Sequence, residues 1–158
     1  MTFPLPDATH VKVLLSMLFD GLTIKPAKKF LVSGNKGAYC AVYVGVDGSP
    51  VGVCACDIAF AANSGAALSM LPPAVAKEAV KGNALTEVMV ANLREVMNIC
   101  TRLLLRDDTA HLRLEQVYPA QALPAAIAQK LAACARQVDF EVSMGKYAPG
   151  MISVMDIS

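Results

Sequence analysis

The sequence has few charged residues and no block of like charge. Charged residues make up 17% of the chain, against about 25% in an average soluble domain, and the formal net charge is +1. The densest basic cluster, Lys25, Lys28 and Lys29, is smaller than the basic face that nucleic-acid binding proteins present. We therefore expect no nucleic-acid partner.

The sequence also lacks the features that direct a chain to a membrane. The most apolar region, residues 51–71, is interrupted by Asp57, Asn63 and Ser64, well short of the roughly 20 apolar residues that a span needs. The first ten residues contain neither the basic segment nor the cleavage site of a secretion signal. These absences predict a cytoplasmic protein without a membrane-spanning segment.

Residues suited to metal binding or nucleophilic catalysis are scarce. His10 and His111 are the two histidines, and neither has a G-x-S-x-G motif nearby, so we expect no Ser/His/Asp triad. The five cysteines lie in apolar patterns, which favours buried, reduced thiols over disulfides or a metal site. Cys54 and Cys56 form a C-x-C pair whose side chains would share one face of a strand. We expect no metal site in this chain.

Hydrophobic residues are in excess, at 55% of 158 residues. A chain of this length buries roughly 70% of its unfolded surface, which is enough for a core without disulfides. We predict one domain spanning residues 1–158. The apolar excess indicates either a deeply buried sheet or an apolar surface used for association.

The clearest local pattern is a β-hairpin. Residues 38–46 and 50–58 are almost wholly apolar and flank the turn sequence Asp47-Gly48-Ser49, as expected of strands covered on both faces. The sequence of its second strand is partly repeated near the end of the chain. Pro50 and Pro149 are each followed, after six residues, by an Asp-Ile pair that begins at Asp57 and at Asp156. This echo suggests two related hairpin units. Further strands are predicted at 22–33, 111–118, 139–144 and 150–157.

Helical periodicity and capping residues predict the remaining elements. Asp7 and Asp57 are suitable N-caps, and Gly82-Asn83 is a suitable helix end. The predicted helices span 7–20, 58–70, 74–81, 85–104 and Pro124 to about Arg136. The sequence thus predicts an α+β fold, in which apolar antiparallel β-hairpin units form a sheet packed with a long central helix and flanking helices.

The long helix at 85–104 carries an unusual polar face. At about 100° per residue its large apolar residues fall on one arc, and Glu95, Asn98 and Arg102 fall on the opposite side, with Ala91 and Arg94 beside them. An ordinary solvated helix face would also account for these residues. A carboxylate and a carboxamide three residues apart, next to a small residue, would equally suit a surface that another protein approaches closely.

The order of elements resembles the CheC/CheX/FliY phosphatase family of bacterial chemotaxis. The likeness is carried by LFDGLTI (18–24), by residues 37–71 and by ANLREVMNIC (91–100), which contains Glu-x-x-Asn. It is closest to CheX, which has a single Glu-x-x-Asn helix. The resemblance implies hydrolysis of the phospho-aspartate of a CheY-like receiver domain in two-component or chemotaxis signalling.

The resemblance also implies roles for individual residues. Asn98 would orient the attacking water, and Glu95 would pair with the active-site lysine of the receiver. Ala91 stands where the family usually has Asp or Ser, and Arg102 stands where a small residue is common. Ala91, Arg94 and Arg102 would contact the partner. The chain would need no cofactor of its own, because the Mg²⁺ belongs to the receiver.

The resemblance implies a homodimer as well, and the Met-rich last strand is a candidate edge for pairing. Two other functions stay open. One is a non-catalytic module that binds a receiver or another signalling partner. The other is a small-ligand sensor, for which the sequence offers no dedicated residues.

Overall fold

A computed structural model describes residues 3–105 and 111–158. Within these ranges the chain forms one six-stranded sheet in the order β1-β5-β6-β3-β2-β4, and every neighbouring pair is antiparallel. The strands are β1 (Leu22–Pro26), β2 (Tyr39–Val44), β3 (Pro50–Cys56), β4 (Arg113–Pro119), β5 (Arg136–Met144) and β6 (Gly150–Asp156).

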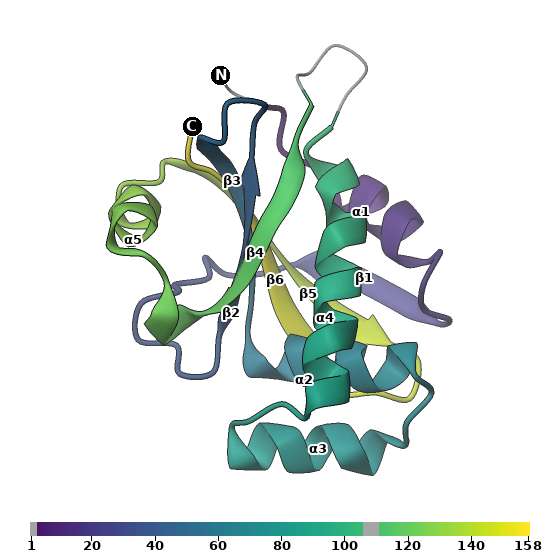
Figure 1. Ribbon diagram of the computed structural model, residues 1–158. Coiled ribbons are helices and arrows are strands. Elements are labelled where there is room, and N and C mark those ends of the chain that lie inside the picture. The colour runs from purple at the N-terminus through teal and green to yellow at the C-terminus, as the bar shows by residue number, and fades with distance from the viewer. Residues whose placement is uncertain (1–2, 106–110) are drawn as a thin grey trace.

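Helices pack on both faces of this sheet, so the fold is α+β as predicted. Figure 1 shows α4 in front of α1 and α2 on one face, and α5 alone on the opposite side. The helices are α1 (Ala8–Leu15), α2 (Ile58–Leu68), α3 (Pro73–Gly82), α4 (Glu87–Ile99) and α5 (Ala125–Ala132), with short 3₁₀ turns η1 (Cys100–Leu103) and η2 (Ala120–Ala122). None of the helices in the described ranges has the length and hydropathy needed to cross a bilayer.

The strands of the β2–β3 hairpin alternate their side chains between two hydrophobic clusters, one on each face of the sheet. Tyr43 and Cys54 point into the cluster formed with α1, α2 and α4. Their neighbours Val42 and Val53 point into a second cluster under α5. All four side chains are fully buried. Continuous apolar strands therefore lie in a sheet covered on both faces, which confirms the expectation from the sequence.

The predicted helix caps are present. The Asp7 side chain accepts a hydrogen bond from the His10 amide, and Asp57 does the same for Phe60. Asn83 ends α3 in a left-handed conformation, with φ of 51°. These local devices fix where the helices begin and end.

Several predicted boundaries are wrong. Residues 16–20 do not continue α1, and residues 27–33 do not continue β1. The α-helical geometry of the long helix stops at Ile99 and is followed by a 3₁₀ turn. Arg136, predicted as the end of a helix, is the first residue of β5.

The two hairpins that carry the sequence echo lie side by side. β3 pairs with β6 in antiparallel register, with Cys54 opposite Val154, so the hairpins β2–β3 and β5–β6 join in the middle of the sheet. The prediction that the Met-rich last strand is an edge is therefore wrong. The edges of the sheet are β1 and β4.

Candidate functional site

The candidate site lies on α4, whose inner face is fully apolar. Thr86 caps its start by accepting a hydrogen bond from the Met89 amide at 3.3 Å. Met89, Leu93, Val96 and Met97 are completely buried against the sheet and α2. Burial of these side chains fixes the rotation of α4 and determines which residues face outward.

The outer face of α4 presents the residues that the sequence singled out. Ala91, Arg94, Glu95 and Asn98 are all exposed. Glu95 and Asn98 are three positions apart within the helix, so their side chains are neighbours on its surface. α4 lies in front of the sheet in Figure 1. Because Leu93, Val96 and Met97 are buried and Glu95 and Asn98 are exposed, the pair lies on the side of α4 away from the core.

Arg102 is also exposed, but it lies on η1 and not on α4 itself. A 3₁₀ turn advances about 120° per residue instead of 100°, so Arg102 is rotated away from the position that a continuous helix would give it. The sequence-based helical wheel therefore places Arg102 too close to Asn98 in angle. Arg102 lies at the end of the face and not at its centre.

Three side-chain hydrogen bonds fasten α4 from different sides. The buried Tyr43 hydroxyl of β2 donates to the Met97 carbonyl at 2.6 Å. The Asn92 amide donates to the Gly65 carbonyl of α2 at 2.8 Å and to the Ser69 hydroxyl at 2.7 Å. These bonds hold the helix to the sheet and to α2, so its outer face is a preorganised surface.

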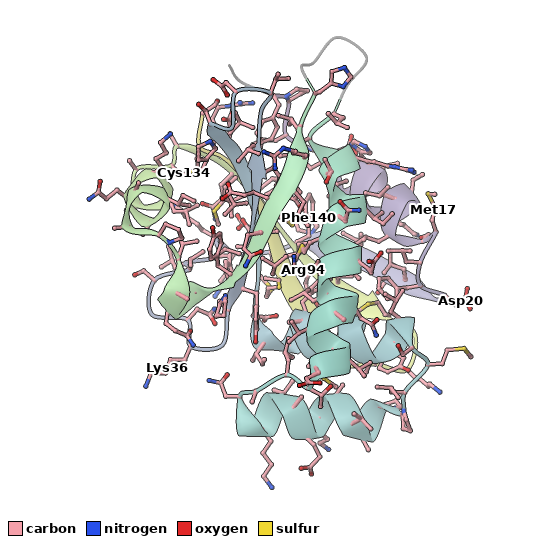
Figure 2. The ribbon with its side chains drawn as sticks, viewed as in Figure 1. Met17, Asp20, Lys36, Arg94, Cys134 and Phe140 are labelled. Carbon is pink, nitrogen blue, oxygen red and sulfur yellow. The ribbon has the colours of Figure 1, made fainter. Side chains whose placement is uncertain are left out.

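Arg94 provides the third connection, to the edge strand β4. Its Nη2 atom donates to the Gln116 side-chain oxygen at 3.4 Å, and Figure 2 shows Arg94 between α4 and β4. The predicted partner-contacting residue Arg94 thus already has a contact within the chain. Asn92 and Tyr43 were not predicted to support the site, and the one available signal was an asparagine inside a helix, where it is disfavoured.

Glu95 and Asn98 differ from these anchoring residues. Among the hydrogen bonds and ion pairs of residues 3–105 and 111–158, none uses either side chain. A carboxylate that faces solvent can accept from a cation on another molecule, and an exposed amide can both accept from and donate to a water. The arrangement therefore suits recognition of a second protein more than structural support.

The cysteines are free and do not form a reactive site. Cys40, Cys54, Cys56 and Cys100 are buried, and Cys134 is half-buried. Burial raises the pKa of the Cys40 thiol to about 12. Burial, together with the nearby Asp57 charge, also raises the pKa of Cys56. Thiols held protonated in this way are poor nucleophiles and poor metal ligands. The predicted burial is found for four of the five cysteines and is wrong for Cys134.

No protein-family model and no curated protein matches the sequence. Solved structures do resemble it. A chain of the FliM-SpeE complex from H. pylori has a TM-score of 0.58 at 11% identity, with 94% of this chain and 80% of that chain covered. A chain of the CheX-CheY-BeF3-Mg²⁺ complex from Borrelia burgdorferi has a TM-score of 0.55 at 14% identity, with 92% and 91% covered.

The FliM middle domain from H. pylori is similar to a lesser degree, with a TM-score of 0.51 at 12% identity and 94% and 84% of the two chains covered. At such low identity these likenesses establish a common fold. The chain has the CheC/CheX/FliY-type fold that its sequence resembles, and this prediction is confirmed.

Proposed function

We propose that this chain is a phosphatase for the phosphorylated aspartate of a receiver domain, and that Glu95 and Asn98 are its reactive pair. The observation that carries the proposal is their position: both are exposed, adjacent and without a partner in the described part of the chain, on a helix fastened to β2 and α2. Support comes from the fold shared with a chain of the CheX complex, which was crystallised with CheY, BeF3 and Mg²⁺.

The chemistry requires little of this chain beyond positioning. Water attacks the phosphorus of the acyl phosphate in line with the leaving aspartate oxygen, which regenerates the carboxylate and releases inorganic phosphate. The receiver supplies Mg²⁺ to neutralise the phosphoryl oxygens. The Asn98 amide accepts a hydrogen bond from the attacking water and holds it in line without competing for its proton.

Glu95 has a docking role in this proposal. Glu95 lies about one helical turn from Asn98. Its carboxylate pairs with the active-site lysine of the receiver, beside the phosphoryl group. The small side chain of Ala91 lets the receiver approach the helix surface. Arg102, at the end of the same face, contacts the receiver at the margin of the interface.

The test is phosphate release from candidate receivers loaded with acetyl phosphate and Mg²⁺. The chain should accelerate loss of the phosphoryl group, and Asn98→Ala should remove about 100-fold of that acceleration, since displacement of a positioned reactant costs about this much. Glu95→Ala should mainly weaken receiver binding.

Matched controls are available on other elements. Glu78 on α3 and Gln129 on α5 are exposed, so Glu78→Ala and Gln129→Ala remove an acid and an amide away from the site. Both should leave the rate unchanged. Acceleration that survives Asn98→Ala and Glu95→Ala would show that the reactive site is elsewhere.

The second candidate is a module that binds a receiver or another signalling protein without catalysis. Ala91 in place of the usual Asp or Ser, and the structural likeness to a chain of the FliM-SpeE complex, favour it. Receiver binding that depends on Glu95, with no change in phosphate release by any receiver tested, would establish this second function.

A further inference from the structure

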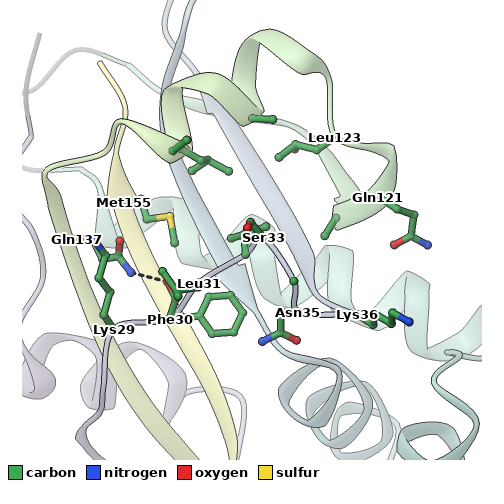
Figure 3. Close-up of a pocket in the computed structure, with 16 residues that line it drawn as sticks. Lys29, Phe30, Leu31, Ser33, Asn35, Lys36, Gln121, Leu123, Gln137 and Met155 are labelled. Carbon is green, nitrogen blue, oxygen red and sulfur yellow. Dashed lines mark hydrogen bonds between the residues drawn. The ribbon is translucent and has the colours of Figure 1, made fainter.

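The sheet face opposite α4 contains a cavity of about 570 Å³ between α5 and the loop that joins β1 to β2. This volume is within the range of about 300–1,000 Å³ typical of small-molecule sites. Figure 3 shows the cavity between Phe30, Leu31 and Ser33 of the loop on one side and the segment from Gln121 to α5 on the other. It is separate from the Glu95–Asn98 face.

Small side chains on α5 create this space. Ile127, Ala128 and Leu131 form the stripe of α5 that faces the sheet, and Ile127 is buried at 5% exposure. Ala128 lies on the same stripe and lines the cavity, yet it is exposed. Its small, exposed side chain leaves the space beside it unfilled.

The opposite wall is held in place by the sheet. The Phe30 amide donates to the Asp139 carboxylate at 3.0 Å, and the Gln137 amide donates to the Phe30 carbonyl at 2.9 Å. The next side chain, Leu31, lines the cavity and is 63% exposed. A fixed loop that presents a large exposed apolar side chain to a cavity indicates a preformed apolar site.

The charges at the two ends of the cavity differ. Lys29 lies at one end beside Gln137, whose amide also donates to Asp139 at 2.8 Å, so a carboxylate is close to this end. Lys36 lies at the other end near Gln121. The residues that line this cavity and the adjoining hollow around Lys36 include no Asp or Glu. The Lys36 end therefore favours an anion.

We propose that this cavity binds a small amphipathic carboxylate, with its apolar body between Leu31 and α5 and its carboxylate at the Lys36 end. The apolar residues of the lining, among them Leu31, Leu123 and Leu131, favour a ligand with an apolar body, and two lysines without an acidic residue in the lining favour an anion over a cation. The site gives a location to a small-ligand function, for which the sequence alone offered no residues. It does not depend on the proposed phosphatase activity.

Decanoate, below its micelle-forming concentration, is a suitable probe by isothermal titration calorimetry. One molecule should bind per chain in a saturable manner. Decanol and decyltrimethylammonium should bind up to about fivefold more weakly, which corresponds to the loss of one exposed ion pair.

The variant Ala128→Phe fills the cavity and should abolish binding. Ala126→Phe is the matched control, because Ala126 is exposed on the same helix and does not line the cavity. Lys36→Glu should weaken decanoate binding by about tenfold, and Lys29→Glu should weaken it less. Both lysines are exposed, so these two variants test the site even if Ala128→Phe disturbs α5.

Three results would overturn the proposal. They are an absence of saturable decanoate binding, equal affinities for the anionic, neutral and cationic probes, and equal effects of Lys36→Glu and Lys29→Glu.

Discussion

The Tyr43 hydroxyl lies where α4 loses its regular hydrogen-bonding pattern. It is fully buried and donates to the Met97 carbonyl, three residues before the 3₁₀ turn begins at Cys100. In a continuing α-helix this carbonyl would accept from the amide four residues later. One phenol thus connects β2 to the last turn of α4, beneath the proposed site.

Replacement of Tyr43 by Phe should destabilise the fold by about 1–3 kcal/mol, because a buried carbonyl loses its donor while the ring remains. Urea denaturation measures this free energy of unfolding. Tyr118→Phe is the matched control, since the Tyr118 hydroxyl makes one long, exposed hydrogen bond to Glu115 at 3.4 Å and should change stability little. Equal effects of the two variants would contradict a structural role for Tyr43.

Asp57 should make stability depend on pH. Its Oδ1 atom accepts from the Phe60 amide at 2.8 Å and the Met151 amide at 3.0 Å, but burial raises the pKa of the carboxyl above its ordinary value of 3.8. The folded chain then holds this proton more tightly than the unfolded chain. Asp57 therefore lowers stability as pH rises from the unfolded pKa through the higher folded pKa.

Asp57→Asn retains an oxygen acceptor for both amides and removes the charge. Its free energy of unfolding, relative to wild type, should increase as pH rises through that interval. Asp57→Ala should lose about 2–4 kcal/mol at the low-pH end, because a helix cap is removed and the Met151 amide loses its acceptor. This loss relative to wild type should become smaller as pH rises through the same interval, since alanine also lacks the titrating carboxyl. Urea denaturation of the three proteins across pH 3–7 measures both effects. If the free energies of unfolding of Asp57→Asn and wild type differed by the same amount at every pH, the proposed role of the Asp57 charge would be wrong.

The sequence predicts which residues of α4 are exposed, but it does not predict the contacts that hold the helix in place. Helical periodicity alone placed Glu95 and Asn98 on the exposed face, because the burial of Leu93, Val96 and Met97 sets the rotation of the helix. The Tyr43 anchor joins residues 54 positions apart, and the Asn92 bond to Gly65 joins residues 27 positions apart. Such contacts follow from the packing of elements, which local sequence does not encode.

Among the elements, α2 and the start of β6 approach each other closely. A Cβ atom added at Gly150 would lie 2.3 Å from the Phe60 nitrogen and 2.4 Å from its Cα. Both are backbone atoms, so no side-chain rotation relieves the overlap. Only glycine at position 150 permits α2 to pack this close to the start of β6.

Gly150→Ala should therefore destabilise the chain by about 3 kcal/mol, the upper range for overpacking, and lower the melting temperature. Thermal denaturation followed by circular dichroism measures the change. Gly82→Ala is the control, because nothing lies within 4 Å of the added Cβ and alanine favours the helix. A Gly150→Ala protein as stable as wild type would contradict this close packing.

Element boundaries were predictable where capping residues were present. Asp57 and Asn83 mark ends that the structure reproduces. Arg136 was assigned to a helix because an alanine-rich run precedes it without a glycine or proline. Its guanidinium instead pairs with the buried Asp156 of β6 and donates to the Phe3 carbonyl at 2.9 Å. These distant contacts override the local helix preference.

For the whole molecule, strand order decides which surfaces can associate. The last strand is central, so a sheet that continues into a second copy must do so through β1 or β4. Both edge strands contain charged residues and end in a proline, Lys25 and Pro26 in β1 and Arg113 and Pro119 in β4, and such residues discourage edge pairing. Periodicity predicted the strands themselves but carries no information on their order, which explains the incorrect assignment of β6.

The homodimer implied by the family resemblance stays a prediction. Light scattering coupled to gel filtration should then give about twice the chain mass of 16.6 kDa at micromolar concentration. A mass of one chain would argue against the dimer. It would leave the fold and the proposed reactive pair unaffected, because neither uses residues from a second copy.

The fastening of α4 to β2 and α2 has a kinetic consequence. The helix is already ordered before a partner arrives, so association costs little backbone entropy on this side of the interface. The encounter should then be governed by diffusion and by orientation of the two bodies, without a slow isomerisation step. Any delay in complex formation would originate in the partner.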